Sequence, residues 1–256
     1  MNNQDEIKFV FFGSSQFSKY VLKELEGQGL HPSLVIDDAK KELPMDELRT
    51  LKAEVFIVAS FGKILPEELI YMPQHKTLNV HPSLLPQYRG PSPIQETILK
   101  GGEVGTTIMR LDEKMDHGPI IAQESLEISP WPDHYAIVEA KLGSHGGRLL
   151  GDILPKWLRG EVEEVPQDES LATYTKMIKK EDGLIDLSGN AEENYRKVLA
   201  YSTWPGAHLI FKRKDGKEIR VVVKDGELKE GLFYPTRVIP AGRREMSWED
   251  FLRGNE

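Results

Sequence analysis

The order of apolar and polar positions in the first half of the chain is typical of strands that alternate with helices. An apolar run over residues 7–12 leads into Gly13-Ser14-Ser15, and apolar residues then recur at helical spacing from Phe17 to Leu25. This order predicts a strand, a tight turn and a helix capped by Ser14 or Ser15. Further short strands are predicted over residues 34–36, 54–59 and 78–81. We therefore expect an open, doubly wound, mostly parallel α/β sheet.

The pattern changes in the last third of the chain. Two more strands and a long helix, from Asp133 to about Trp157, complete the first part, and a charged connector follows over residues 160–180. Beyond residue 185 there are short apolar segments separated by Asp215-Gly216 and Asp225-Gly226, which are typical hairpin turns. This predicts a small OB-like β-barrel. We place the domains at residues 1–168 and 169–256.

Composition and charge narrow the possible classes of protein. The net charge is −8, and residues 1–168 carry 17 Lys and Arg against 26 Asp and Glu, while residues 169–256 carry 16 against 15. A general nucleic-acid coat is therefore not expected. The chain has no cysteine, which excludes disulfides and thiolate nucleophiles, and no histidine pair has the spacing of metal ligands. It lacks a long apolar run, and residues 1–6 do not resemble a signal peptide, so we expect a cytoplasmic protein without a membrane contact.

Three polar residues are candidates for catalysis. Asn79 and His81 are two residues apart on one predicted strand, so their side chains share a face at the carboxyl end of that strand, where open α/β sheets bind ligands. Asp116 lies in a later loop that could fold back toward His81. From the residues alone, structural roles remain open: a strand-end histidine is often a core residue, and an aspartate-rich loop is usually solvated.

Longer motifs around these residues resemble those of a known family. Asn79-Val80-His81-Pro82-Ser83-Leu84-Leu85-Pro86, with Arg89-Gly90 after it, is similar to the signature of the formyltransferases that use 10-formyltetrahydrofolate. Asp116-His117-Gly118 resembles the downstream Asp-x-Gly of that family. Two further segments, over residues 12–17 and 60–66, resemble its opening turn and the loop that lines its folate pocket.

The resemblance implies a catalytic set and a donor pocket. Asn79 and His81 would donate hydrogen bonds to the oxygen that gains charge, and Asp116 would hold His81 and move a proton. No metal is implied. The formyl donor would be 10-formyltetrahydrofolate, held by eight residues, of which the first two could equally be ordinary core residues: Ile64, Leu65, Ser83, Leu84, Leu85, Pro86, Leu111 and Asp112.

The acceptor is also implied by resemblance. Arg89-Gly90-Pro91-Ser92-Pro93-Ile94-Gln95 and segments over residues 172–181, 204–207 and 241–247 resemble the branch that formylates methionyl-tRNA in translation initiation. The implied partners are charged initiator tRNA and the folate donor, and a monomer is expected. The candidate acceptor contacts are Arg89, Lys176, Lys179 and Lys180, although Arg89 could equally form an ion pair that fixes its own loop.

Two departures from this branch keep alternatives open. The long basic insertion after the second strand is absent, since Ile36 and Val55 are less than twenty residues apart, and the sequence stops soon after Leu252. A formyltransferase acting on an amino-sugar nucleotide remains possible, as does a hydrolase that releases formate from the same donor. An enzyme acting on glycinamide ribonucleotide and an inactive RNA-binding protein are disfavoured by the C-terminal part and by the catalytic set, respectively.

Overall fold

A computed structural model describes residues 7–255, so the prediction made from residues 1–6 lies outside the described residues. The chain divides into two compact units. The N-terminal unit comprises the residues through Pro93, Glu103–Glu127 and Glu139–Thr175, and the C-terminal unit comprises Ile94–Gly102, Ile128–Val138 and the residues from Lys176 onward. The domain boundary that we place between residues 168 and 169 stays a prediction.

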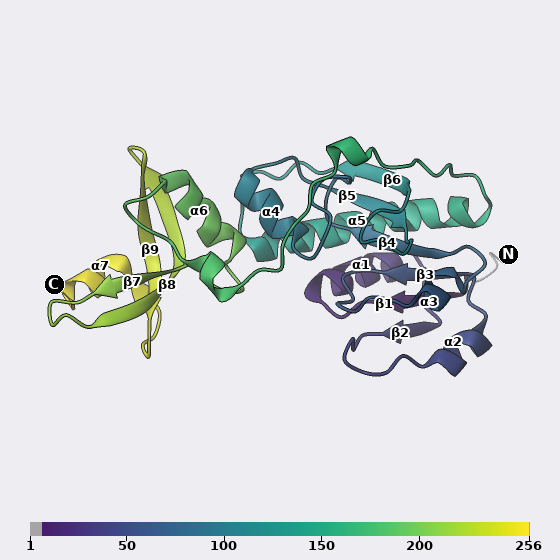
Figure 1. Ribbon diagram of the computed structural model, residues 1–256, viewed down its shortest axis with the longest axis horizontal. Helices are drawn as coiled ribbons and strands as arrows, with labels where there is room; N and C mark the ends of the chain where they lie inside the picture. The colour runs from purple at the N-terminus through teal and green to yellow at the C-terminus, as the bar shows by residue number, and fades with distance from the viewer. Residues whose placement is uncertain (1–6, 256) are drawn as a thin grey trace. The chain divides into compact units, whose positions relative to one another are not determined.

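The N-terminal unit contains the predicted α/β sheet, in the strand order β2-β1-β3-β4-β5-β6 (Figure 1). The strands are β1 (Phe9–Phe12), β2 (Leu34–Ile36), β3 (Val55–Val58), β4 (Thr77–His81), β5 (Gly105–Arg110) and β6 (Ile120–Ser125). β1 to β4 are parallel, and β5 is antiparallel to both of its neighbours. The doubly wound, mostly parallel sheet is therefore confirmed.

Helices cover both faces of this sheet, which explains why β1 and β3 are apolar throughout. On one face, Val10, Phe12, Phe56 and Val58 form a core with Leu48 of α2 (Met45–Leu51) and with Leu69 of α3 (Glu67–Tyr71). The other face packs against α5 (Tyr135–Leu158), which lies along α1 (Gln16–Gly27). Ser15 caps α1 and accepts the Ser18 N–H at 3.2 Å.

Glycines in α5 permit close packing instead of weakening the helix. A Cβ at Gly146 would lie 2.6 Å from a methyl group of Val80 in β4, and one at Gly143 would lie 2.7 Å from Cβ of Tyr20 in α1. These are distances that a side chain cannot occupy, so only glycine allows the helix to approach both neighbours. α5 runs for 24 residues, with Pro155 near its C-terminal end.

The C-terminal unit contains the predicted antiparallel β structure. Its sheet has the order β10-β9-β8-β7 and packs on α6 (Ala191–Ala200) and α7 (Trp248–Arg253), while α4 (Pro93–Lys100) contributes all but its first residue to the same unit. The core centres on Val198, Val221, Val238 and Phe251. The strands are β7 (His208–Lys212), β8 (Glu218–Lys229), β9 (Leu232–Pro240) and β10 (Met246–Ser247).

One predicted hairpin turn is wrong. Asp225-Gly226 lies inside β8, at a position where the register with β9 shifts, and the β8–β9 turn falls at Glu230-Gly231. Two-residue hairpin turns favour positive φ angles, and Glu230 and Gly231 have φ of 51° and 77°. The turn predicted at Asp215-Gly216 does connect β7 and β8, with φ of 82° at Gly216.

Among the described residues, no helix is both long enough and apolar enough to cross a membrane.

Candidate active site

Asn79 and His81 lie on the face of β4 that carries α3. Thr77, two residues before Asn79, donates its hydroxyl to the Ile70 carbonyl at 2.9 Å, whereas Val80 points to the opposite face and to α5. Because side chains alternate along a strand, Asn79 and His81 share the face of Thr77. Both are buried, with exposed fractions of 8% and 4%.

Asp116 reaches His81 from a loop that runs alongside β4. The loop begins at Leu111, whose N–H bonds the carbonyl of Thr77, the first residue of β4, at 2.8 Å. Five residues later, Asp116 Oδ1 lies 3.7 Å from Nδ1 of His81, the last residue of β4. The other carboxylate oxygen, Oδ2, accepts the Gly90 N–H at 2.7 Å. Asp116 is therefore anchored through one oxygen and presents the other to His81.

The hydrogen bonds of His81 define its tautomer. Its Nε2 lies 3.2 Å from the carbonyl oxygen of Tyr88. A carbonyl can only accept, so Nε2 carries a proton and Nδ1 faces the carboxylate of Asp116. In contrast, no hydrogen bond within the described part of the chain engages the Asn79 side chain. Its amide has no protein partner and, although the residue is only 8% exposed, keeps some access to solvent, which is what a ligand-binding amide requires.

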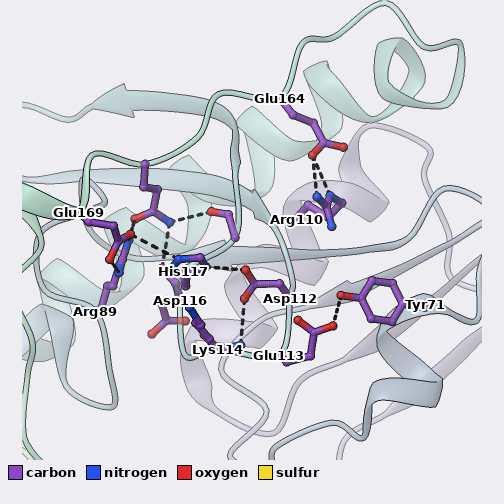
Figure 2. Close-up of polar contacts among 12 residues, drawn as sticks. Tyr71, Arg89, Arg110, Asp112, Glu113, Lys114, Asp116, His117, Glu164 and Glu169 are labelled. Carbon is purple, nitrogen blue, oxygen red and sulfur yellow. Dashed lines mark hydrogen bonds and ion pairs between the residues drawn. The ribbon is translucent and has the colours of Figure 1, made fainter.

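Arg89 is buried, with 1% of its side chain exposed, and its guanidinium makes five hydrogen bonds. Nε and Nη2 donate to Gln167 Oε1 at 3.1 and 2.8 Å, the two Nη atoms pair with Glu169, and Nη1 also donates to Tyr174. The bonds to Glu169 raise the pKa of Arg89, and Arg89 lowers the pKa of the Glu169 carboxyl. Arg89 thus forms the ion pair that was its alternative role (Figure 2), and its contact with the acceptor stays a prediction.

Gln167 connects this ion pair to the Asp116 loop. Its Nε2 donates to the carbonyl oxygens of Asp116 and Gly118 at 2.9 and 2.7 Å. The segment that contains Gln167 is also joined to the Arg89 loop by backbone bonds, since the Arg89 N–H donates to Thr173 O at 2.9 Å and the Thr175 N–H to Arg89 O at 2.7 Å. Sequence reasoning did not identify Gln167, because no motif or spacing marks a lone glutamine in a connector.

The same loop has further polar contacts, visible in Figure 2. Asp112, a predicted folate contact, lies 2.6 Å from Nδ1 of His117 through its Oδ2. Tyr71 donates its hydroxyl to Glu113, and this bond raises the pKa of Tyr71 to about 12. The Asp112 carboxylate is thus already engaged inside the loop.

The predicted pocket residues have different environments. Leu65 is a core residue beneath α3, whereas 87% of Ile64 is exposed. Leu111 packs against the same core as Leu65. In the Ser83–Pro86 segment, the Ser83 hydroxyl donates to Gln87 O at 2.7 Å, and Leu85 is buried, with its N–H bonded to Thr107. Leu84 packs over Gly105, and the Pro86 carbonyl accepts the Thr173 N–H.

The connector lysines Lys176, Lys179 and Lys180 are exposed and belong to the C-terminal unit. Among residues 7–255, no group of three or more His, Asp or Glu side chains is placed to hold a metal ion.

Comparison with known proteins defines the class to which this fold and site belong. Residues 9–153 match the model of the formyl transferase family, and residues 177–239 match its C-terminal domain. The chain therefore belongs to the formyl transferase family.

Individual relatives give more detail. The chain is 37% identical over 247 residues to a methionyl-tRNA formyltransferase of Chloroflexus aurantiacus, a match that covers 87% of this chain and 78% of the relative. A solved methionyl-tRNA formyltransferase from Clostridium thermocellum has the same fold, with a TM-score of 0.69, 18% identity and coverage of 91% and 98%. HypX from Aquifex aeolicus, solved in complex with tetrahydrofolic acid, has a TM-score of 0.74 at 18% identity over 97% of this chain and 47% of HypX.

Proposed function

We propose that this protein transfers the formyl group of 10-formyltetrahydrofolate to the amino group of methionyl-tRNA. The observation that carries the proposal is the contact between His81 and Asp116 at the carboxyl end of β4, beside the unpartnered amide of Asn79. The family and the relatives named for the same reaction support it. We place the reaction in the cytoplasm, where charged initiator tRNA is used, and propose a monomeric enzyme.

The chemistry follows from the hydrogen-bonding capacity of three side chains. As the acceptor amine forms a bond to the formyl carbon, negative charge develops on the formyl oxygen. The donors that stabilise it are the Asn79 amide and the Nε2–H of His81, which in the structure faces the Tyr88 carbonyl. Asp116 Oδ1, whose partner oxygen is fixed by Gly90, accepts the proton that the amine loses. This proton ends on N10 of the folate as the bond between N10 and the formyl carbon breaks.

The donor would lie against the segments that flank this site. We propose that the folate ring contacts Ile64, Leu111 and the Ser83–Pro86 segment, because Ile64 exposes most of its apolar side chain where a flat ring could cover it. Leu65 would act from beneath, as part of the core that supports this surface. Asp112 would present its backbone to the ring, since its carboxylate bonds His117.

The acceptor would be held electrostatically through the connector. Because Arg89 is buried in its own ion pair, we assign phosphate contacts to the three exposed lysines and not to Arg89. Neutralising one phosphate changes the slope of log binding constant against log salt concentration by about 0.7–0.9. Replacing the three lysines with glutamine should therefore flatten the salt dependence of tRNA binding and raise KM for tRNA, while kcat changes little.

One assay tests the reaction and its acceptor. The protein is incubated with 10-formyltetrahydrofolate and, in separate reactions, with methionyl-tRNA, an amino-sugar nucleotide, or buffer alone, and the folate product and the mass of the acceptor are followed. We expect formylation of methionyl-tRNA. Faster formylation of the amino sugar would identify a sugar formyltransferase, and release of formate in buffer alone would identify a hydrolase.

The catalytic assignment is tested by substitution in the same assay. Asn79→Ala, His81→Ala and Asp116→Asn should each lower kcat by roughly 10²–10³-fold, the effect of losing an oxyanion donor or a general base. His31→Ala and Asp46→Asn are matched controls at exposed positions and should leave kcat unchanged. Any of the three site variants that keeps full turnover removes its residue from the catalytic set.

A further inference from the structure

We propose that Gln167 is a positioning residue that fixes Asp116 for the formyl transfer and is itself held by Arg89 and Glu169. The inference rests on the proposed function, in which Asp116 is the proton acceptor. It assigns a role in that reaction to a side chain outside every recognised motif, 51 residues from Asp116 along the chain.

The chemistry of its neighbours determines how the Gln167 amide is oriented. One end faces the Nε and Nη2 atoms of Arg89, which can only donate, and the other end faces the carbonyl oxygens of Asp116 and Gly118, which can only accept. The amide oxygen must therefore face Arg89, and the amide nitrogen must face the loop. Both protons and both lone pairs of the amide are used, so a primary amide matches all four partners.

The Asp116 loop needs such a restraint because of its backbone conformation. Asp116 has a φ of +49°, in the left-handed region that non-glycine residues adopt at a cost in free energy. Gln167 bonds the carbonyl of Asp116 itself and that of Gly118, two residues later. Gly118 lies so close to the end of β5 that a Cβ there would be 1.9 Å from the Arg110 carbonyl oxygen. These two hydrogen bonds from Gln167, which we call the clamp, hold the segment that sets the direction of the Asp116 carboxylate.

Arg89 gives the clamp its rigidity. Its guanidinium is buried and is held by Glu169 at 2.6 and 3.0 Å, so its two bonds to Gln167 have a fixed direction. The loop that contains Arg89 also supplies the Gly90 N–H that anchors Asp116 Oδ2. The backbone and the carboxylate of Asp116 are therefore both fixed from the Arg89 region, one directly by Gly90 and the other through Gln167.

The discriminating variant is Gln167→Glu. A carboxylate keeps the size of the side chain and its pairing with Arg89, but it removes both donors and places negative charge against two carbonyl oxygens. We expect kcat to fall by about 10²-fold, the effect of a small misplacement of a catalytic group, with KM for the acceptor unchanged. Gln167→Met, which has no hydrogen-bond donor, should show the same loss of kcat. Gln28→Glu, at an exposed position bonded only weakly to Arg148 O at 3.5 Å, is the matched control and should retain full turnover.

A double-mutant cycle with Asp116→Asn separates positioning from any independent role. If Gln167 acts through Asp116, Gln167→Glu should cause no further loss of kcat in the Asp116→Asn background. An equal fold-loss in both backgrounds, or full turnover of Gln167→Glu, would overturn the proposal. If Asp116→Asn itself retains turnover, the proposed catalytic role fails instead.

Crystal structures of the variants provide a readout that does not depend on activity. In Gln167→Glu and Gln167→Met, Asp116 should leave the positive-φ region, and the separation of its carboxylate from His81 Nδ1 should increase beyond 3.7 Å. A variant in which the loop keeps its conformation would refute the positioning role. This holds even if the wild-type protein formylates none of the acceptors tested.

Discussion

Replacing Arg89 with methionine distinguishes a structural role of this residue from a role in binding phosphate. Methionine fills most of the space of the aliphatic part of arginine, so the substitution mainly removes the guanidinium. It leaves Gln167, Glu169 and Tyr174 without the donor that they share.

The expected loss of stability can be estimated from the exposure of these partners. Glu169, 55% exposed, and Tyr174, 65% exposed, can bond water instead, so their lost bonds cost little. Gln167 is only partly exposed, and the loss of both donors to Oε1 costs about 1–3 kcal/mol. With some loss of packing, Arg89→Met should lower the free energy of unfolding by about 2–3 kcal/mol. Arg89→Lys keeps the charge but not the forked geometry, and it should lose about half as much.

Two measurements check this prediction. Urea unfolding of the N-terminal unit can be followed by Trp157 fluorescence after the other three tryptophans are replaced with phenylalanine. Arg159→Met, which removes an exposed ion pair with Glu161, is the control and should leave the free energy of unfolding nearly unchanged. The salt dependence of tRNA binding should be unchanged in Arg89→Met. Wild-type stability together with a slope reduced by about 0.7–0.9 would show that Arg89 neutralises a phosphate and would refute the structural role.

Three further predictions follow from the contacts around the site. Gly90 has a φ of +112°, and a Cβ there would lie 2.8 Å from Thr175 Oγ1. Gly90→Ala should therefore lower the free energy of unfolding by about 1–3 kcal/mol, measured by thermal unfolding, and should also lower kcat in the turnover assay. Because Arg89 lowers the pKa of Glu169, their ion pair stabilises the fold at pH values above the ordinary pKa of a carboxyl, and this contribution is lost as the pH falls through the lowered pKa. The difference in urea midpoint between the wild type and Glu169→Gln should therefore disappear in acid. Limited trypsin digestion should cut first within residues 160–180, on the C-terminal side of Thr175, because the backbone of Thr175 is bonded to the Arg89 loop. Early cleavage inside the sheet would contradict this prediction.

The strands of the sheet could be predicted because their burial on both faces is visible in short stretches of the sequence. A strand that is covered on both faces must be apolar along its length, and β1 and β3 show this directly in the sequence. The C-terminal hairpins were harder to place, because Asp225-Gly226 and Glu230-Gly231 both end in a favourable glycine. The pairing of β8 with β9, and not the local sequence, decides which of the two is the turn.

The candidate site could be predicted only in part, for a similar reason. Asn79 and His81 are strand neighbours, so their shared face follows from the period of a β-strand. The meeting of Asp116 with His81 was suggested by a motif, because nothing in the pattern of the loop determines its path. Gln167 could not be found, since its partners are distant along the chain and its role depends on the four hydrogen bonds that the fold brings together.

The length of the loop beside β4 sets how far Asp116 lies from the start of that loop. From Thr77 to His81 the strand advances about 13 Å, at about 3.3 Å per residue, and the loop from Leu111 to Asp116 covers the same path between its bonds at either end. Exposed positions within it, such as Lys114 and Met115, can vary in identity without moving its ends. Their number is more constrained, because hydrogen bonds hold both ends of the segment and an inserted or deleted residue would have to be accommodated between them. The length of this segment, more than its composition, is therefore what selection on the reaction would preserve.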